Sequence, residues 1–109
     1  MAKGYWIAHL DINAPEFQRQ YVAANRAAFK KFGARYIVRG GKDIAGFPSG
    51  SRHVVKHGTM RDRHVVLEFE SYEQALACYE SPEYQAAIKF RDRGCTVDVV
   101  IIEGYDATV

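Results

Sequence analysis

The chain has 109 residues, of which 48% are hydrophobic and 26% are charged, and its formal net charge at pH 7 is +2. This length suits one domain over residues 1–109 and is too short for two ordinary domains. The small net charge argues against a nucleic-acid partner. No apolar run approaches the ~18 residues that a membrane span needs, and the N-terminus lacks the pattern of a signal peptide. We therefore expect a cytoplasmic protein, in which Cys78 and Cys95 are reduced thiols that match no metal or redox spacing.

The first third of the chain predicts a strand, a helix and a second strand. Aromatic and branched residues over 4–11 indicate the first strand. Asn13 is then the candidate N-cap of a helix that runs from Pro15 to Phe32 with apolar residues at helical spacing, and Gly33 is placed to end it. A second strand is predicted over residues 34–39, where Gly40 and Gly41 are expected to stop it.

The middle of the chain, residues 42–62, is rich in glycine, serine, proline and charge, and it is long for a connection inside so small a domain. Residues 53–55 are a candidate for a short strand, which would make this segment a projecting hairpin arm. A third strand is predicted over residues 63–69.

The last third of the chain predicts a helix in two pieces and a final strand. Ser71 and Gln74 form the pattern of a capping box, in which each side chain bonds the other residue's backbone. The first piece should end near Tyr79, and a second, capped by Ser81, should end near Gly94. A strand is expected over residues 97–103, followed by a loose tail at 107–109.

This β-α-β-β-α-β order predicts an α+β, ferredoxin-like fold: a four-stranded antiparallel sheet with both helices on one face. The first and last strands are apolar on both faces, which is typical of sheets that are covered on both sides. We expect Trp6, Leu10, Val100 and Ile102 to lie together on the uncovered face. Such a patch predicts a homodimer that forms through the sheet face.

Six segments recur together in a family that this chain resembles, and they span nearly the whole sequence. The segments are Tyr5-Trp6-Ile7-Ala8, Tyr21-Val22-Ala23-Ala24-Asn25, Val38-Arg39-Gly40-Gly41, Val66-Leu67-Glu68-Phe69, Ser81-Pro82-Glu83-Tyr84-Gln85 and Glu103-Gly104-Tyr105. The chain is similar to a small bacterial family of unknown function, DUF1330, of the dimeric α/β-barrel superfamily. The resemblance implies a ferredoxin-like homodimer and no established reaction. The segment 42–62 looks longer than is usual in that family.

Five polar or aromatic residues are candidates for a ligand site, and the first three lie on the first helix and the middle strands. Asn25 lies on the helix face that turns toward the sheet, where a buried amide needs partners. It either makes a structural hydrogen bond to the sheet or orients a ligand. Arg39 and Glu68 are explained by cross-strand charge pairing, with Arg35 opposite Glu68. Alternatively, Arg39 anchors a carboxylate-bearing ligand.

The other two candidates, Tyr84 and Arg91, share a stripe of the last helix. Core packing is the simpler account of Tyr84 and of the neighbouring Tyr72 and Tyr79. Arg91 either extends to solvent or guards the mouth of a pocket.

The histidines carry weaker signals. His9 and Glu103 could form an acid–base pair, but antiparallel strands would hold them apart. The spacing of His53, His57 and His64 matches no standard metal site, so we expect no metal and no other cofactor.

No catalytic motif stands out, and the catalytic residues and the question of enzyme activity stay open. We expect a dimeric module that binds or transforms a small aromatic or carboxylated metabolite in a pocket between the helices and the sheet. The alternative is a protein-interaction or structural module that uses the loop at 42–62.

Overall fold

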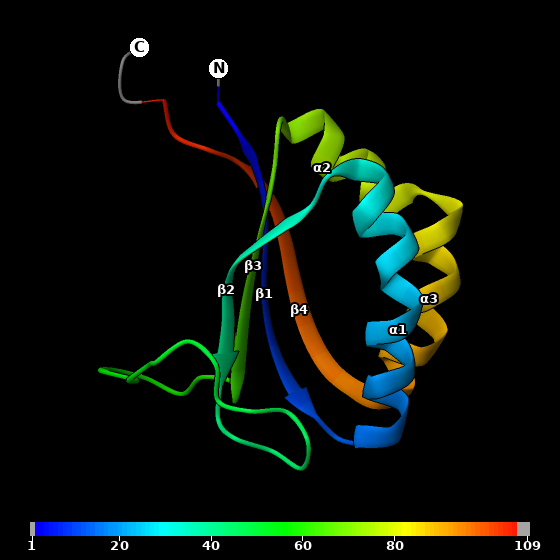
Figure 1. Cartoon of the computed structure of the whole chain (residues 1–109). Coiled ribbons are helices and arrows are strands. Elements are labelled where there is room, and N and C mark those ends of the chain that lie inside the picture. Colours follow the sequence, from blue (N-terminus) through cyan, green and yellow to red (C-terminus); the bar gives the residue numbers. More distant parts are fainter. Residues whose placement is uncertain (1, 107–109) are drawn as a thin grey trace.

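The computed structural model describes residues 2–106, and its helices all cover one face of a four-stranded sheet (Figure 1). The elements follow the predicted order, with the second helix in two pieces. They are β1 (Gly4–Ile12), α1 (Pro15–Phe32), β2 (Arg35–Gly41), β3 (Arg63–Phe69), α2 (Tyr72–Glu80), α3 (Pro82–Gly94) and β4 (Cys95–Glu103).

The strands lie in the order β2-β3-β1-β4, and each neighbouring pair is antiparallel. This is the ferredoxin-like α+β arrangement that the sequence predicts, with both crossovers on the same side. Arg35 lies opposite Glu68 and forms an ion pair with it, as expected. No helix among residues 2–106 is long and apolar enough to cross a membrane.

The N-terminus of α1 differs from the prediction. Ala14 is its N-cap residue and makes no side-chain capping bond. The amide of Asn13 instead donates to the hydroxyl of Thr96 at 2.8 Å, so the prediction that Asn13 caps this helix is wrong. The C-terminal prediction is confirmed, because Gly33 adopts the left-handed conformation (φ 69°) and closes the helix.

Only half of the predicted capping box forms at α2. The hydroxyl of Ser71 accepts from the backbone of Gln74 at 3.1 Å. The Gln74 side chain, however, donates to the carbonyl of Phe32 and so ties α2 to the end of α1. The predicted restart is confirmed, since Ser81 accepts from the backbone of Tyr84 at 3.1 Å and begins α3.

Trp6 and Leu10 lie on the helix-covered face of the sheet, and the prediction that they lie on the uncovered face is wrong. Both side chains point toward the helices and are buried, with 3% and 6% of their surface exposed. Trp6 lies opposite Ile101 and Leu10 opposite Val97. Residues directly opposite one another in an antiparallel pair share a face. Trp6 and Leu10 therefore belong to the core and not to the uncovered face.

The uncovered face is nevertheless apolar, as the two-faced pattern predicts. Tyr5 lies opposite Ile102, and Ile7 lies opposite Val100. The side chains of Val100 and Ile102 are about half exposed. We call the surface made by Tyr5, Ile7, Val66, Val100 and Ile102 the open face.

The segment between β2 and β3 forms no strand at residues 53–55, so that prediction is wrong. β2 continues through Gly40, which lies opposite His64, and ends at Gly41 instead of at the predicted residue 39. A Cβ on Gly40 would lie 2.2 Å from the carbonyl oxygen of Ser49, so only glycine lets the loop return this close. The predicted tail at 107–109 lies outside the described residues.

Gly94 sets the closest approach of α3 to α1. A Cβ at this position would lie 2.7 Å from the backbone nitrogen of Gln18, and the Gly94 carbonyl accepts from the backbone of Asn13 and Ala14. We expect Gly94→Ala to lower the free energy of unfolding by about 1–3 kcal/mol, because backbone must move to make room. Chemical denaturation measures this change. Ala86→Ser, at an exposed position of the same helix, should change the free energy of unfolding by less than about 0.5 kcal/mol. Equal losses of stability in the two variants would show that the close approach of the helices at Gly94 does not require glycine.

Candidate functional site

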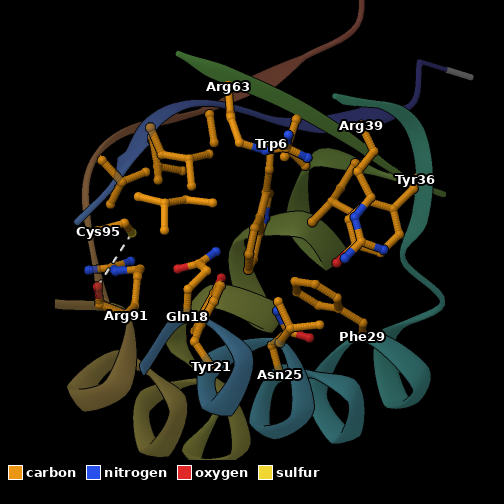
Figure 2. A pocket seen from close by; sticks show the side chains of 18 of the residues that line it. Trp6, Gln18, Tyr21, Asn25, Phe29, Tyr36, Arg39, Arg63, Arg91 and Cys95 are labelled. Atoms are coloured by element: carbon orange, nitrogen blue, oxygen red, sulfur yellow. Dashed lines mark hydrogen bonds between the residues drawn. The ribbon is translucent and has the colours of Figure 1, made fainter. Parts of the chain in front are cut away.

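A cavity of about 80 Å³ lies between the sheet and the helices α1 and α3 (Figure 2). A water molecule needs roughly 10–15 Å³ of such volume, so the cavity holds on the order of six waters or one small ring. Aromatic and aliphatic side chains make most of the wall, together with a few polar ones. The polar and aromatic lining residues are Trp6, Gln18, Tyr21, Asn25, Phe29, Tyr36, Arg39, Phe47, Arg63, Tyr84, Arg91 and Cys95.

Trp6 stands at the centre of this wall. Its indole nitrogen donates to the carbonyl of Ala75 at 2.8 Å, and its ring packs edge-on against Phe29 of α1 and Tyr84 of α3. Successive side chains of β1 point to opposite faces of the sheet, so Ala8 lies on the same cavity-facing side as Trp6. The same packing that forms the core therefore forms one side of the cavity.

Tyrosine hydroxyls gather around Arg91 on the helix side. Tyr21 and Tyr84 share a hydrogen bond of 2.8 Å, and Arg91 donates to Tyr79 at 2.9 Å and to Tyr84 at 3.3 Å. The Arg91 side chain is only 12% exposed. It therefore sits in the wall instead of extending to solvent. Tyr84 packs in the core, as the simpler of its two interpretations predicted, and it also lines the cavity.

Burial raises the pKa of Tyr21 well above its ordinary value and also raises the pKa of Tyr84. The hydrogen bonds of Tyr84 to Tyr21 and Arg91 oppose its shift. Burial likewise raises the pKa of Cys95 to about 11. These groups are neutral at physiological pH, so they can donate hydrogen bonds but do not act as bases.

Asn25 lies in the cavity wall and is 2% exposed. Its amide lies beside the hydroxyls of Tyr21 and Tyr36 and lowers the pKa of both against the effect of burial. Asn25 of α1 therefore lies close to Tyr36 of β2, and its structural hydrogen bond to the sheet stays a prediction. The side chain is at the same time placed to contact a ligand.

Arg39 and Glu68 lie on opposite faces of the sheet. Arg39 lines the cavity, with its guanidinium 4.5 Å from the centre of the Tyr36 ring. Glu68 points to the open face, where it pairs with Arg35 and accepts from the hydroxyl of Tyr5 at 3.2 Å. The structure thus brings Asn25, Arg39, Tyr84 and Arg91 to one cavity and leaves Glu68 outside it.

Two polar residues of the cavity wall, Gln18 and Arg63, were not predicted from the sequence. Gln18 lies in the polar first turns of α1, and Arg63 begins β3 after a charged loop, so both resemble surface residues in the sequence. In the structure they are 6% and 7% exposed. Figure 2 shows Gln18 reaching up from α1 and Arg63 reaching down from the sheet. Only the alternation of β3, which puts Arg63 on the same face as Leu67, hinted at its position.

The histidines do not form a metal cluster. Among the described residues, no group of three or more His, Cys, Asp or Glu side chains could hold a metal ion. His9 lies opposite Asp98 and not Glu103, which excludes the acid–base pair. It contacts His64 instead, with 2.8 Å between the two Nδ1 atoms. His53 lies beside this pair, its ring centre 5.6 Å from that of His64.

The fold and the cavity define the class of the protein: a ferredoxin-like α+β chain with a small, aromatic-lined cavity between helices and sheet. Within this class, the chain belongs to the family described as Domain of unknown function (DUF1330), whose model matches residues 3–105. A search of the curated proteins finds no match.

Solved structures with this fold include proteins from several bacteria. One is a protein of unknown function from Rhodopseudomonas palustris (TM-score 0.65, 13% identity), with 96% of this chain and 84% of that chain covered. Another is SnoaB, a cofactor-independent oxygenase from Streptomyces nogalater (TM-score 0.58, 7% identity, coverage 98% and 97%). A third is a NIPSNAP domain protein from Burkholderia xenovorans (TM-score 0.55, 16% identity, coverage 98% and 97%). At these identities the likeness shows the fold alone.

The contact between His9 and His64 requires at least one ring to be neutral, because the bond needs an acceptor. Burial, followed by the charges of His9, His53 and Arg63, lowers the pKa of His64 from its ordinary value of 6.5. The unfolded chain then binds the proton more readily than the folded chain, so this contribution to stability is present above about pH 6.5 and is lost as the pH falls through the lowered pKa.

We therefore expect the free energy of unfolding to fall more steeply between about pH 7.5 and pH 5 in the wild type than in His64→Gln. Urea denaturation at each pH measures this slope. His57→Gln, at an exposed loop position, should keep the wild-type slope. A His64→Gln slope equal to that of the wild type would contradict the assignment.

Proposed function

We propose that the protein is a homodimeric module that binds, and in its enzymatic form transforms, a small aromatic or carboxylated metabolite in the cavity between the helices and the sheet. The observation that carries the proposal is the cavity itself: aromatic rings form its walls, three arginines line it, and its lining includes no aspartate or glutamate. Pockets of this kind, apolar with a few placed polar groups, are typical of small-molecule sites.

The enzymatic form is a cofactor-independent reaction that passes through an anion. SnoaB, which shares this fold, is a cofactor-independent oxygenase. Support from this chain comes from Arg39, Arg63 and Arg91, which would stabilise developing negative charge. Because burial raises the pKa of the lining tyrosines and of Cys95, these groups stay neutral at physiological pH; the arginines stabilise the anion, and the proton that the substrate loses passes to solvent water.

The proposal places the protein in the cytoplasm. Its two cysteines, Cys78 and Cys95, are both buried and free. Unpaired thiols are typical of proteins in a reducing compartment.

A thermal-shift screen of small aromatic and carboxylated metabolites tests the binding function. We expect at least one compound to raise the melting temperature, and Asn25→Ala to remove most of that rise because the ligand loses a wall contact. Asn25→Ala should also lower the free energy of unfolding by about 1–3 kcal/mol, since it truncates a buried side chain that packs beside two tyrosines. Arg26→Ala, at the exposed neighbouring position, should keep the response. If no compound raises the melting temperature, the proposed binding function is wrong.

The dimer is proposed to form through the open face. Covering several hundred Å² of apolar surface, at roughly 25 cal/mol per Å², contributes several kcal/mol before the costs of association. A second copy related by a two-fold axis is the simplest cover, because the same surface then meets itself.

The loop between β2 and β3 adds to this surface. Figure 1 shows part of it extending away from the helices, beyond the open-face side of the sheet. Val54 at 74% and Val55 at 47% exposure are apolar side chains on this loop. A partner on the open face would lie within reach of them. The second candidate function, a module that docks another protein through the loop, rests on the same exposed valines.

Ile102→Arg tests the dimer, because it would place a charge at an exposed apolar position of the open face. We expect light scattering after size exclusion to show a dimer for the wild type and a monomer for Ile102→Arg. Ala86→Arg, on an exposed position of α3, should stay dimeric. A wild-type monomer at micromolar concentration would refute the dimer.

Replacing residues 52–58 with a short glycine linker separates the two roles of the loop. If the loop clasps the second copy, the dimer should dissociate at higher protein concentration than the wild type does. If it docks another protein, self-association should be unchanged.

A further inference from the structure

Arg63 is a buried cation without an anion. Its side chain is part of a residue that is 7% exposed, and no carboxylate of the described residues forms an ion pair with it. Nη1 donates to the carbonyls of Lys42 at 2.8 Å, Pro48 at 3.1 Å and Phe47 at 3.4 Å. These bonds use one of the three guanidinium nitrogens. Burying a charge without a counterion is costly, so the cavity is electrostatically incomplete.

The neighbouring charge increases this deficit. Burial lowers the pKa of Arg63, and the charge of Arg39 lowers it further. Asp43 has the opposite but smaller effect. Arg39 lies at the exposed side of the cavity, stacked on Tyr36. Two guanidinium groups that repel one another across a cavity wall are a favourable setting for a carboxylate, which can bridge them.

Gln18 supplies a second, independent observation on the opposite wall. The residue is 6% exposed, and its Oε1 is buried without a hydrogen-bond partner among the described residues. In Figure 2 its amide points up into the cavity. A buried acceptor that stays unbonded costs about as much as a lost hydrogen bond. A hydroxyl or N–H group of a ligand would satisfy it.

The space between these groups suits one aromatic ring. The cavity volume of about 80 Å³ is on the scale of one small ring, and Trp6, Phe29 and Tyr36 offer ring surfaces. Aromatic side chains stack or pack edge-on with an aromatic ligand in such a setting.

We infer that the cavity takes a compact aromatic carboxylate that also carries a hydrogen-bond donor, with the carboxylate between Arg63 and Arg39 and the donor on Gln18. The inference rests on the proposed binding function and adds the class of ligand and its orientation. It commits to a single-ring anion and excludes a neutral ring of the same size.

Isothermal titration of the full chain with matched probes tests this inference. The probes are the three monohydroxybenzoates, benzoate without the hydroxyl group, and the hydroxybenzamides, which keep the shape without the charge. We expect one hydroxybenzoate to bind about fivefold to tenfold more tightly than benzoate. The corresponding benzamide should bind at least about tenfold more weakly than its acid.

Three variants assign these preferences to residues. Arg39→Gln should weaken the acid about tenfold and leave the benzamide unchanged. Arg63→Lys keeps the charge but loses the bonds to the loop carbonyls, so its melting temperature is measured beside its affinity. Gln18→Leu should abolish the preference for the hydroxyl and raise the melting temperature of the ligand-free protein, because it removes an unbonded buried oxygen. Arg52→Gln, exposed on the loop, is the matched control and should bind as the wild type does.

The outcomes separate this inference from the proposed function. If benzamides bind as tightly as the acids, or Arg39→Gln has no effect on the acids, the charged orientation is wrong while a small-molecule site stands. If no probe binds at millimolar concentration but a metabolite from the thermal-shift screen does, the ligand class is wrong. If no compound of either set binds, the proposed function fails as well.

Discussion

The indole of Trp6 connects every layer of this protein. It rises from β1, its N–H group bonds to the carbonyl of Ala75 in α2, and its ring contacts Phe29, Phe69, Tyr79 and Tyr84 from the surrounding elements. A buried ring with a satisfied N–H fixes both the distance and the rotation of the helices over the sheet. The cavity is the space beside this ring that the helices leave unfilled, so its shape depends on the same contact.

The cavity retains groups that a purely structural core would avoid. Among the described residues, Arg63 has no carboxylate partner and the Gln18 Oε1 has no hydrogen-bond partner, although apolar side chains would fill these positions at lower cost. Such local conflicts with the rules of stability tend to occur at functional sites. By contrast, Arg61 outside the cavity has two acidic partners, Asp11 and Asp98. Arg35 on the open face likewise pairs with Glu68, whereas no carboxylate of the described residues forms an ion pair with Arg63 in the cavity wall.

The two faces of the sheet have different surroundings. One face carries Trp6 and Leu10 and holds the core and the cavity. The other carries Val100 and Ile102, which no element among residues 2–106 covers, together with the contact between His9 and His64. A sheet that is apolar on both sides needs a second cover, so the proposed ligand binding inside the subunit and the proposed association between subunits would use opposite sides of the same strands.

The order of elements, the break between α2 and α3, and the C-terminal end of α1 could be predicted from the sequence, because helical spacing, Gly33 and Ser81 act locally. The ion pair between Arg35 and Glu68 was also predictable, since antiparallel neighbours determine which residues lie opposite each other. Local rules failed where a distant group competed: Thr96 bonds Asn13, and Phe32 bonds the side chain of Gln74.

The residues of the cavity were harder to predict from the sequence than the fold, because tertiary contacts decide which side chains are buried there. The polarity pattern marked Asn25, Arg39 and the stripe of Tyr84 and Arg91, but both parities of β1 are apolar, so the pattern alone could not decide which one faces the helices. Arg63 and Gln18 look like surface residues along the chain. The returning loop buries the first and the approach of Gly94 buries the second. The sequence by itself determined the fold and the existence of two apolar sheet faces, because both follow from local periodicity. Only the packing of the helices and the loop decided which face encloses the cavity and which charges lie inside it.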